Sequence, residues 1–293
     1  MALVLAVANQ KGGVGKSTTA VNLAATFTAQ YGLRTLVIDM DGQCNATAAL
    51  MGMDWQPTHT IKDVLWEPMA IADVMVPTRH DPRLSVVAGS PELSYFEKSI
   101  EPHVWDDIVQ EARATLLNGL PDEVDVVILD TPPTLGLWLN TALGASDAAL
   151  VVCWPDSFSL SGMTQVLETI AHIRDSANSG LGLAGLLVNN VRTGVREHDG
   201  YLTLFRTQFP DLMLEPPVLQ RTVFSEAQRL AVPVQWMSDR AAPEVRRWYG
   251  QIAGSILERC GVTAPAVEST AADSGGLGPE ASVGRVPRAR AGV

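Results

Sequence analysis

The sequence contains few cysteines, and they are far apart. Cys44, Cys153 and Cys260 form no Cys-x-x-Cys pair and no cluster with histidine. Their spacing therefore suggests neither a disulfide framework nor a structural zinc site. We expect all three thiols to be buried or chemically idle.

Long hydrophobic runs are also missing. No uninterrupted apolar run approaches the ~18 residues that a membrane-spanning helix needs. The N-terminal run MALVLAVANQ is apolar, but it lacks a basic start and a small-residue cleavage site, and a glycine-rich loop follows it directly. This run indicates a buried strand, and we expect a cytoplasmic protein with no membrane partner.

Positive charge is scarce overall, since the formal net charge is −11. Such a balance argues at first against a nucleic-acid partner. The charges are unevenly distributed, however. Residues 1–180 carry 21 acids and 9 bases, whereas residues 181–260 carry 8 acids and 9 arginines. The C-terminal third could therefore still form a basic face that binds nucleic acid.

Short Leu/Val/Ile-rich runs alternate with longer segments of helical periodicity. This alternation predicts an α/β protein with a doubly wound, mostly parallel sheet and helices on both faces. We expect one domain over residues 1–262. The expected strands are Leu3–Ala8, Thr35–Asp39, Leu84–Ala88, Val124–Asp130, Ala148–Cys153 and Leu183–Val188. The expected helices are Lys16–Gln30, Val104–Leu117, Ser159–Arg174, Leu202–Phe209 and Pro243–Cys260.

The last part of the chain differs in composition. Residues 263–293 are rich in Ala, Gly, Ser, Pro and Val and show no periodicity, which predicts a disordered low-complexity tail. The tail carries Arg285, Arg288 and Arg290, which could contact an acidic partner or simply remain solvated.

The segment between the first expected strand and helix reads KGGVGKST, residues 11–18. A loop in this place directs backbone N–H groups and the positive helix end at an anion. We expect Gly12, Gly13, Val14 and Gly15 to surround the phosphates, together with Thr18. Lys16 would neutralise the β- and γ-phosphates during catalysis, and Ser17 would offer its hydroxyl to Mg²⁺. The loop thus predicts an ATP·Mg²⁺ site.

Two acidic motifs follow other expected strands. Asp39 and Asp41 lie at the end of the second strand, and Asp130 ends the apolar run Val126–Leu129. Acids at the carboxyl ends of strands beside the phosphate loop can orient water or hold the water ligands of Mg²⁺. Asp130 fits the Walker B position, which contacts Mg²⁺ through water.

The phosphate loop departs from the ordinary P-loop pattern, because Gln10 replaces its first glycine and Lys11 follows. The run KGGVGKS resembles the deviant Walker A family, which includes ParA/Soj, MinD, the nitrogenase iron protein and arsenite-pump ATPases. The resemblance implies that Lys11 reaches the nucleotide of a second subunit in an ATP-dependent homodimer. A cation delivered in this way is worth on the order of 10³–10⁵ in rate in comparable enzymes.

The same resemblance suggests roles for other residues. The run Asp39–Thr47 is similar to the family's DxDPQxNAT, which implies that Asp41 positions the attacking water and Asp39 supports the Mg²⁺ shell. Gly42 stands where the family usually has proline. The strand GLLVNN resembles one that ends in an adenine-contacting asparagine; we choose Asn189, with Asn190 as the alternative, although asparagine is also a common turn residue.

The C-terminal third is similar to the ParA/Soj pattern in which a SEA run leads to a G-x-P segment. Here Ser225-Glu226-Ala227 is followed by Ala231-Val232-Pro233, without the glycine. The resemblance covers roughly residues 2–260. It implies that arginines of this region make non-specific contacts with the phosphates of double-stranded DNA. Any single arginine could equally be solvated or paired with an acid. The candidates are Arg192, Arg196, Arg221, Arg229, Arg240, Arg246 and Arg247, of which we select Arg192, Arg221, Arg246 and Arg247.

Other relatives fit less well. The cysteines do not match the iron protein, the tail is no basic amphipathic helix of the MinD type, and a metabolic synthetase has no reason to keep Lys11 or the SEA run. We expect a short, Soj-like form without a preceding DNA-binding domain, associated with the nucleoid when ATP is bound. The resemblance implies a slow ATPase stimulated by a ParB/Spo0J-like partner. A related ATPase that positions a protein cargo is the alternative.

Overall fold

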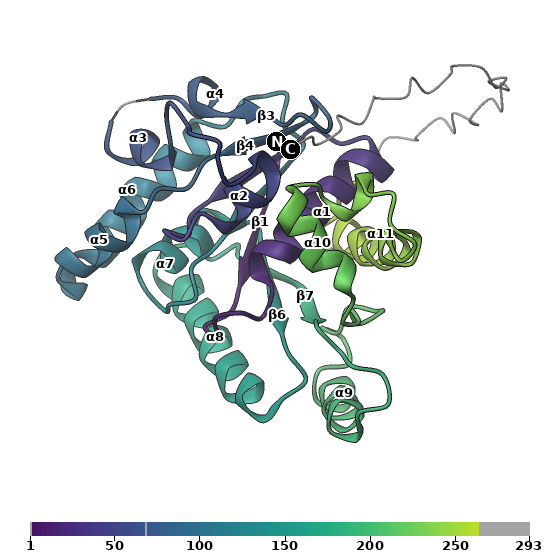
Figure 1. The fold of residues 1–293 in the computed structure, drawn as a ribbon. Helices are drawn as coiled ribbons and strands as arrows, with labels where there is room; N and C mark the ends of the chain where they lie inside the picture. Colours follow the sequence, from purple (N-terminus) through teal and green to yellow (C-terminus); the bar gives the residue numbers. More distant parts are fainter. Residues whose placement is uncertain (1, 68, 264–293) are drawn as a thin grey trace, which may run out of the picture.

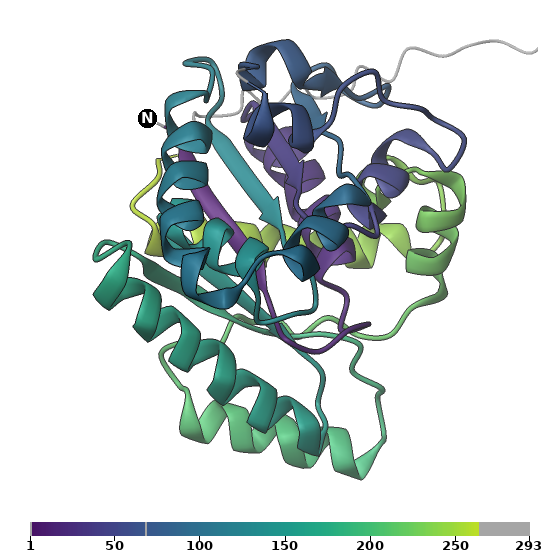
Figure 2. The same ribbon diagram turned by 90° about the vertical axis from the view of Figure 1, so that its left-hand side faces the viewer.

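The computed structural model describes residues 2–67 and 69–263, and its centre is a parallel sheet between two layers of helices (Figures 1 and 2). Within these residues the sheet has seven strands in the order β3-β4-β2-β5-β1-β6-β7. Every neighbouring pair is parallel except β3 and β4. The strands are β1 (Leu3–Ala8), β2 (Thr35–Asp39), β3 (Val76–Pro77), β4 (Leu84–Val87), β5 (Val126–Asp130), β6 (Ala148–Cys153) and β7 (Gly182–Val188).

Helices cover both faces of this sheet. The α-helices are α1 (Lys16–Tyr31), α2 (Asn45–Met51), α3 (Ile61–Trp66), α4 (Ile71–Val74), α5 (Glu92–Ser99), α6 (Trp105–Asn118), α7 (Leu137–Ala145), α8 (Ser157–Ser176), α9 (Arg196–Gln208), α10 (Thr222–Leu230) and α11 (Ala242–Arg259). Two short 3₁₀ turns are η1 (Pro102–Val104) and η2 (Val234–Trp236). Among these described helices, none is long and apolar enough to cross a membrane.

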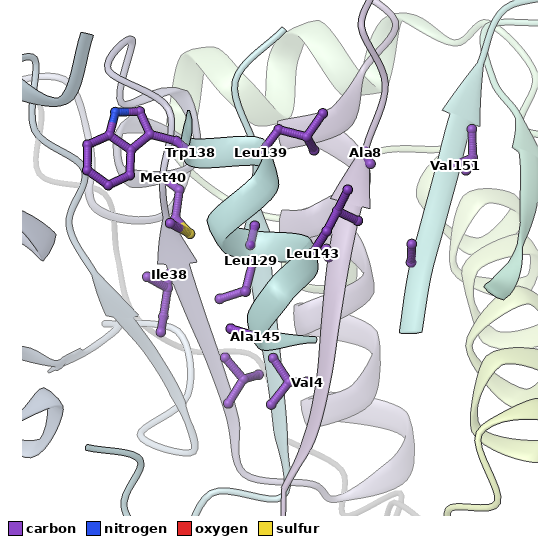
Figure 3. Close-up of a cluster of buried hydrophobic side chains, with 14 of the residues drawn as sticks. Val4, Ala8, Ile38, Met40, Leu129, Trp138, Leu139, Leu143, Ala145 and Val151 are labelled. Atoms are coloured by element: carbon purple, nitrogen blue, oxygen red, sulfur yellow. The ribbon is translucent and has the colours of Figure 1, made fainter. Parts of the chain in front are cut away.

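The strands are nearly continuous hydrophobic runs because both of their faces are buried. Side chains that point to one face pack against α1, α2, α10 and α11. Those that point to the other face pack against α3, α6, α7 and α8. Figure 3 shows the second cluster, in which Ile38, Leu129 and Leu143 meet near the centre of the sheet. Alternation of side chains along each strand thus builds two cores.

The predicted doubly wound fold is confirmed, with differences at the ends of elements. Each expected strand and helix has a counterpart. β5 begins at Val126 and not at Val124, and α9 begins at Arg196, six residues before the predicted Leu202. The polar start of α9 carries little hydrophobic periodicity, which explains the late prediction. The predicted disordered tail lies outside the described residues, apart from its first residue.

The elements that the sequence analysis missed are β3, α2, α3, α4, α5, α7 and α10. Several are too short to show a helical period. α7 is different, because nearly all of its residues are buried and it is apolar on every side. Without a polar face, the run LWLNTALGA gives no amphipathic signal, and only its position between β5 and β6 shows it to be a crossover helix.

Ala231 ends α10 in an unusual conformation. Its φ of 50° lies in the left-handed region, which disfavours residues with a Cβ atom. Its carbonyl oxygen accepts hydrogen bonds from Arg79 (3.1 Å) and His80 (2.8 Å), which keep the residue in place. Ala231 occupies the position of the glycine in the G-x-P segment of the ParA/Soj pattern.

We expect Ala231→Gly to raise the free energy of unfolding by about 0.5–1 kcal/mol, because glycine relieves the left-handed strain at a smaller cost in unfolded-state entropy. Thermal and urea unfolding measure the change. The matched control is Ala114→Gly on the exposed face of α6, which should lower stability by about 0.5–1 kcal/mol. A lower stability for Ala231→Gly would show that the position is not strained.

Candidate nucleotide site

The phosphate loop connects β1 to α1 at the carboxyl edge of the sheet. Gly13 and Gly15 have φ values of 78° and 90°, and Gly15 is the N-cap of α1. A Cβ atom on Gly15 would overlap the side-chain amide of Asn189, which donates a 2.9 Å hydrogen bond to the carbonyl oxygen of Val14. Glycine at position 15 is therefore required by backbone conformation and by space, and the first N–H groups of α1 remain available to an anion.

Lys16 is the central cation of the site. It is buried, and its ammonium group donates a 3.4 Å hydrogen bond to the carbonyl oxygen of Lys11. Burial lowers the pKa of Lys16, while the nearby carboxylates of Asp130 and Asp41 raise it. Asp39 lies beside Asp130, because the two residues are partners in the register of β2 and β5. Three acids, Asp39, Asp41 and Asp130, are therefore close together in the region of Lys16.

Asp130 is fully buried, and among the described residues no well-aligned donor faces either of its carboxylate oxygens. Burial raises the pKa of this carboxyl well above its usual range, and Asp39 raises it further, whereas the nearby Ser17 hydroxyl and Lys16 lower it. An unpaired carboxylate beside a serine hydroxyl is the donor set that Mg²⁺ uses in P-loop proteins. The residues present therefore fit the predicted metal.

We expect Asp130→Asn to stabilise the nucleotide-free protein by about 1–3 kcal/mol while abolishing Mg²⁺-dependent nucleotide turnover. The raised pKa means that the folded state holds a proton more tightly than the unfolded chain. The free energy of unfolding of the wild type should therefore fall as pH rises from about 4 through the pKa of the folded state. The fall should be smaller in Asp130→Asn. Thermal melts in EDTA between pH 5 and pH 8 test this; equal slopes would contradict it.

Asp39 uses its carboxylate within the loop that follows β2. Its Oδ2 atom accepts hydrogen bonds from the backbone N–H (2.9 Å) and hydroxyl (2.7 Å) of Thr47, and Oδ1 accepts one from the N–H of Asp41 (3.2 Å). Burial raises the pKa of Asp39 to about 6 although these hydrogen bonds lower it. In this structure Asp39 fixes the loop that carries Asp41, and a role in the Mg²⁺ shell remains a prediction.

Asp41 lies at the mouth of the phosphate loop. Its Oδ1 atom accepts a 3.0 Å hydrogen bond from the N–H of Gln43. Together with Gly12, Lys16 and Ser17 it lines a cavity of about 390 Å³. The structure thus brings the predicted catalytic and metal-binding residues Lys16, Ser17 and Asp41 to one space.

A second cavity, of about 570 Å³, adjoins the first along the phosphate loop. Its lining includes Asn189 and Asn190, so both predicted asparagines border the space next to the phosphate loop. The side-chain amide of Asn189 is engaged, because its oxygen also accepts a 2.8 Å hydrogen bond from the N–H of Asn190. The sequence analysis missed the wall residues Trp154, Phe224 and Gln228, which come from distant segments. Only Trp154 could have been predicted from the sequence, because it directly follows β6 and therefore lies at the carboxyl edge of the sheet.

Lys11 lies beside this cavity and contacts its own chain. Its Nζ atom is 2.6 Å from the Oδ2 atom of Asp156 and 5.3 Å from the centre of the Trp154 ring. Asp156 is also the N-cap of α8, where it accepts a 2.9 Å hydrogen bond from the N–H of Ser159. In the single chain, Lys11 is therefore held in cis, and its predicted reach to a second subunit requires release from Asp156.

The four selected arginines are spread over the C-terminal third. Arg221 pairs with Glu244 at 3.0 Å and lies over the Trp248 ring. Arg246 donates hydrogen bonds to the carbonyl oxygens of Val234 and Met237, and Arg192 donates one to the side chain of Gln220. Arg247 is exposed on α11. Three of the four thus have intramolecular contacts, and their contact with DNA remains a prediction.

The cysteines are free, as expected from the sequence. Burial and the neighbouring acids Asp39 and Asp41 raise the pKa of Cys44 to about 12. Burial also raises the pKa values of Cys153 and Cys260. Thiols with raised pKa values carry little thiolate, which makes them poor nucleophiles.

The sheet order, the loop between β1 and α1, and the acids at the ends of β2 and β5 define a P-loop nucleotide-binding protein. A model of the AAA domain family matches residues 2–183. Chromosome partitioning protein ParA of Caulobacter vibrioides is 33% identical over 79% of this chain and 85% of its own length. Sporulation initiation inhibitor protein Soj of Bacillus subtilis is 29% identical over 80% of this chain and 90% of its own length. The chain belongs to the ParA/Soj family of AAA-domain proteins with the deviant Walker A motif.

A solved structure with the same fold is cobyrinic acid a,c-diamide synthase from Mycobacterium smegmatis, bound to an ATP analogue and magnesium. Its TM-score is 0.67, its sequence identity is 27%, and the match covers 78% of this chain and 92% of that one. The predicted cofactors, ATP and Mg²⁺, agree with the ligands in that structure.

Proposed function

We propose that this protein is an ATP-hydrolysing DNA partition protein that works through an ATP-dependent homodimer. The observation that carries the proposal is the cavity beneath the phosphate loop. There a buried lysine and the Asp41 carboxylate face the same space, and the unpaired carboxylate of Asp130 lies close to that lysine. Such a site suits a polyanionic nucleotide with its divalent metal.

The residues of the chain divide the chemical work. The N–H groups of the loop and Lys16 bind and orient the phosphates. Ser17 would bind Mg²⁺ through its hydroxyl and Asp130 through a water ligand, and the metal would supply positive charge to the phosphate oxygens. Asp41, held by the N–H of Gln43, orients the attacking water and accepts its proton. Asn189 borders the space for the base, next to the glycines of the loop.

We expect Asp41→Ala to bind ATP normally but to lose most of its turnover, because the water is no longer oriented while Lys16 and the loop are intact. Dimers formed with ATP should then persist. Phosphate release and size-exclusion chromatography measure the two effects, with Asp73→Ala on α4 as the control. An unchanged turnover rate would remove Asp41 from catalysis.

One of the relatives supports DNA partition as the use of this cycle, since ParA of Caulobacter vibrioides is named as a chromosome partitioning protein. In the proposed cycle the ATP dimer binds double-stranded DNA without sequence preference through arginines of the C-terminal third. A ParB/Spo0J-like partner stimulates hydrolysis, and the protein then leaves the DNA. In the ATP-bound state it is associated with the nucleoid.

Binding to random-sequence duplex DNA, measured with ATP, with ADP and without nucleotide across a salt series, tests the proposal. Binding only with ATP, and steeply weaker at higher salt, supports a dimer that contacts phosphates. DNA binding in no state would reject it.

The alternative is a ParA-like ATPase that positions a protein cargo or, less favoured, a metabolic synthetase. The metabolic synthetase is considered because a structure named as a cobyrinic acid a,c-diamide synthase has a similar fold. ATP-dependent dimers without DNA binding would favour the protein cargo. Turnover that depends on a small acceptor molecule would favour the synthetase.

A further inference from the structure

Helix α5 lies between the two loops that border the phosphate cavity. The first loop follows β2 and carries Asp41, and the second follows β5 and contains Pro133, which also lines the cavity. α5 is reached from β4 through Gly89, whose N–H donates a 2.9 Å hydrogen bond to the Thr47 hydroxyl. The structure thus places one short helix against both loops, beside α7 (Figure 1).

The first contact is between Ser94 and Gly42. A Cβ atom on Gly42 would overlap the hydroxyl oxygen of Ser94 and would lie 3.1 Å from its Cβ atom. Gly42 directly follows Asp41, so the Ser94 side chain limits the movement of the loop that carries the carboxylate. The same contact explains why proline, usual at this position in the resembling family, is absent: its ring would occupy the space of the serine.

The second contact is between Glu97 and Gly136, one helical turn further along α5. A Cβ atom on Gly136 would overlap the Glu97 carboxylate. Burial raises the pKa of Glu97 above its usual value, while the backbone amides of Leu137 and Trp138, at the start of α7, act to lower it. A carboxylate at the N-terminus of α7 is favourable to the helix dipole. Glu97 therefore packs against the end of the second loop, with its Oε1 atom buried and without a hydrogen-bond partner among the described residues.

Other contacts hold α5 firmly to α7. The indole N–H of Trp138 donates a 2.8 Å hydrogen bond to the carbonyl oxygen of Leu93. The Phe96 ring lies 5.8 Å from the Trp138 ring and 4.8 Å from the Trp66 ring. Because Ser94 and Glu97 are three residues apart, they lie on one face of the same short helix.

We infer that Ser94 and Glu97 are positioning residues for hydrolysis, and that α5 couples the Asp41 loop to the loop after Asp130. Each side chain fills the space that a glycine leaves open in one loop. A displacement of either loop by the terminal phosphate is passed to the other through the helix. The inference rests on the proposed ATPase activity, and it adds residues that do not touch the nucleotide.

The test uses Glu97→Ala, Gly136→Ala and the double variant in the full chain. Turnover at saturating ATP and Mg²⁺ with duplex DNA should fall at least about tenfold in each single variant, since a small misplacement of catalytic groups costs that much. ATP affinity should stay within about threefold, because Lys16 and the phosphate loop are unchanged. The double variant should resemble Glu97→Ala alone, since both changes break one contact. Glu97→Gln, which keeps the length and an acceptor oxygen, should restore turnover.

A second readout does not depend on turnover. Glu97→Ala should increase amide hydrogen exchange not only in residues 136–138 but also in residues 40–44, which Glu97 does not touch. The matched control is Lys98→Ala, an exposed residue of the same helix. It should change neither turnover nor exchange.

The outcomes separate the inference from the function on which it rests. Wild-type turnover in Glu97→Ala, with exchange raised only near α7, overturns the coupling while leaving the ATPase intact. If the wild-type chain shows no ATP turnover with duplex DNA, the proposed function is wrong, and the exchange of residues 40–44 then decides the coupling alone. A loss of ATP affinity in Glu97→Ala equal to its loss of turnover would show general disruption and would overturn the positioning role.

Discussion

Lys16→Ala should not bind ATP. Lys16 is the buried cation of the phosphate cavity, and no other described lysine lines that cavity. Its removal leaves the phosphates facing Asp41, with Asp130 and Asp39 behind it, so charge repulsion replaces attraction. Calorimetric titration with ATP and Mg²⁺ measures the loss. The control is Lys62→Ala, which removes a surface lysine paired with Glu92 and should bind normally.

The same change should affect stability without any ligand. Lys16 is the cation that lowers the pKa of Asp130, so its removal leaves a buried carboxylate without compensation. We expect Lys16→Ala to melt at a lower temperature than wild type above neutral pH, and Asp130→Asn to recover part of that loss in the double variant. Normal ATP affinity in Lys16→Ala would contradict the assignment of the phosphate loop.

Lys11→Ala should bind ATP but remain a monomer. In the proposed dimer the Lys11 ammonium group contacts the nucleotide of the second subunit, where removing it should cost on the order of 10³ or more in stimulated turnover. In the single chain Lys11 must first be released from Asp156, because the Lys11 Nζ atom lies 2.6 Å from the Oδ2 atom of this partly exposed carboxylate. Sedimentation with ATP and with ADP measures the dimer.

Asp156→Asn provides the comparison for Lys11. It frees the lysine from its partner in the same chain while keeping an oxygen that can accept the hydrogen bond from Ser159. This variant should dimerise with ATP at least as readily as wild type, although the partly exposed ion pair contributes little energy in itself. Full-strength ATP-dependent dimers in Lys11→Ala would count against a lysine that acts in trans.

Much of the fold and the phosphate site could be predicted from the sequence because the signals are local. A buried strand, a glycine-rich turn and a helix follow one another over residues 3–31, so their geometry is fixed by neighbouring residues. The acids Asp39 and Asp130 each end an apolar run, and parallel strands bring such ends to one edge.

The rest of the site depends on segments that meet only in the folded chain. Asp156 was not expected near Lys11, because 145 positions separate them and each has an ordinary local role. Glu97 gave no signal either, since α5 is short and its contact is with the backbone at Gly136. The hydrogen bonds that Asp39 makes with Thr47 were equally hidden, because a carboxylate at a strand end does not reveal where its oxygens point.

Both edges of the sheet are closed to another strand. On one side β3 is two residues long and contains Pro77, which has no N–H to donate. On the other side β7 and the residues after it pair with the segment around 212–219, through hydrogen bonds such as Leu214 to Leu186 and Val218 to Val188. In the residues that the structure describes, neither edge therefore offers a free strand to which a second copy could add, so edge-to-edge strand pairing is closed as a route to aggregation.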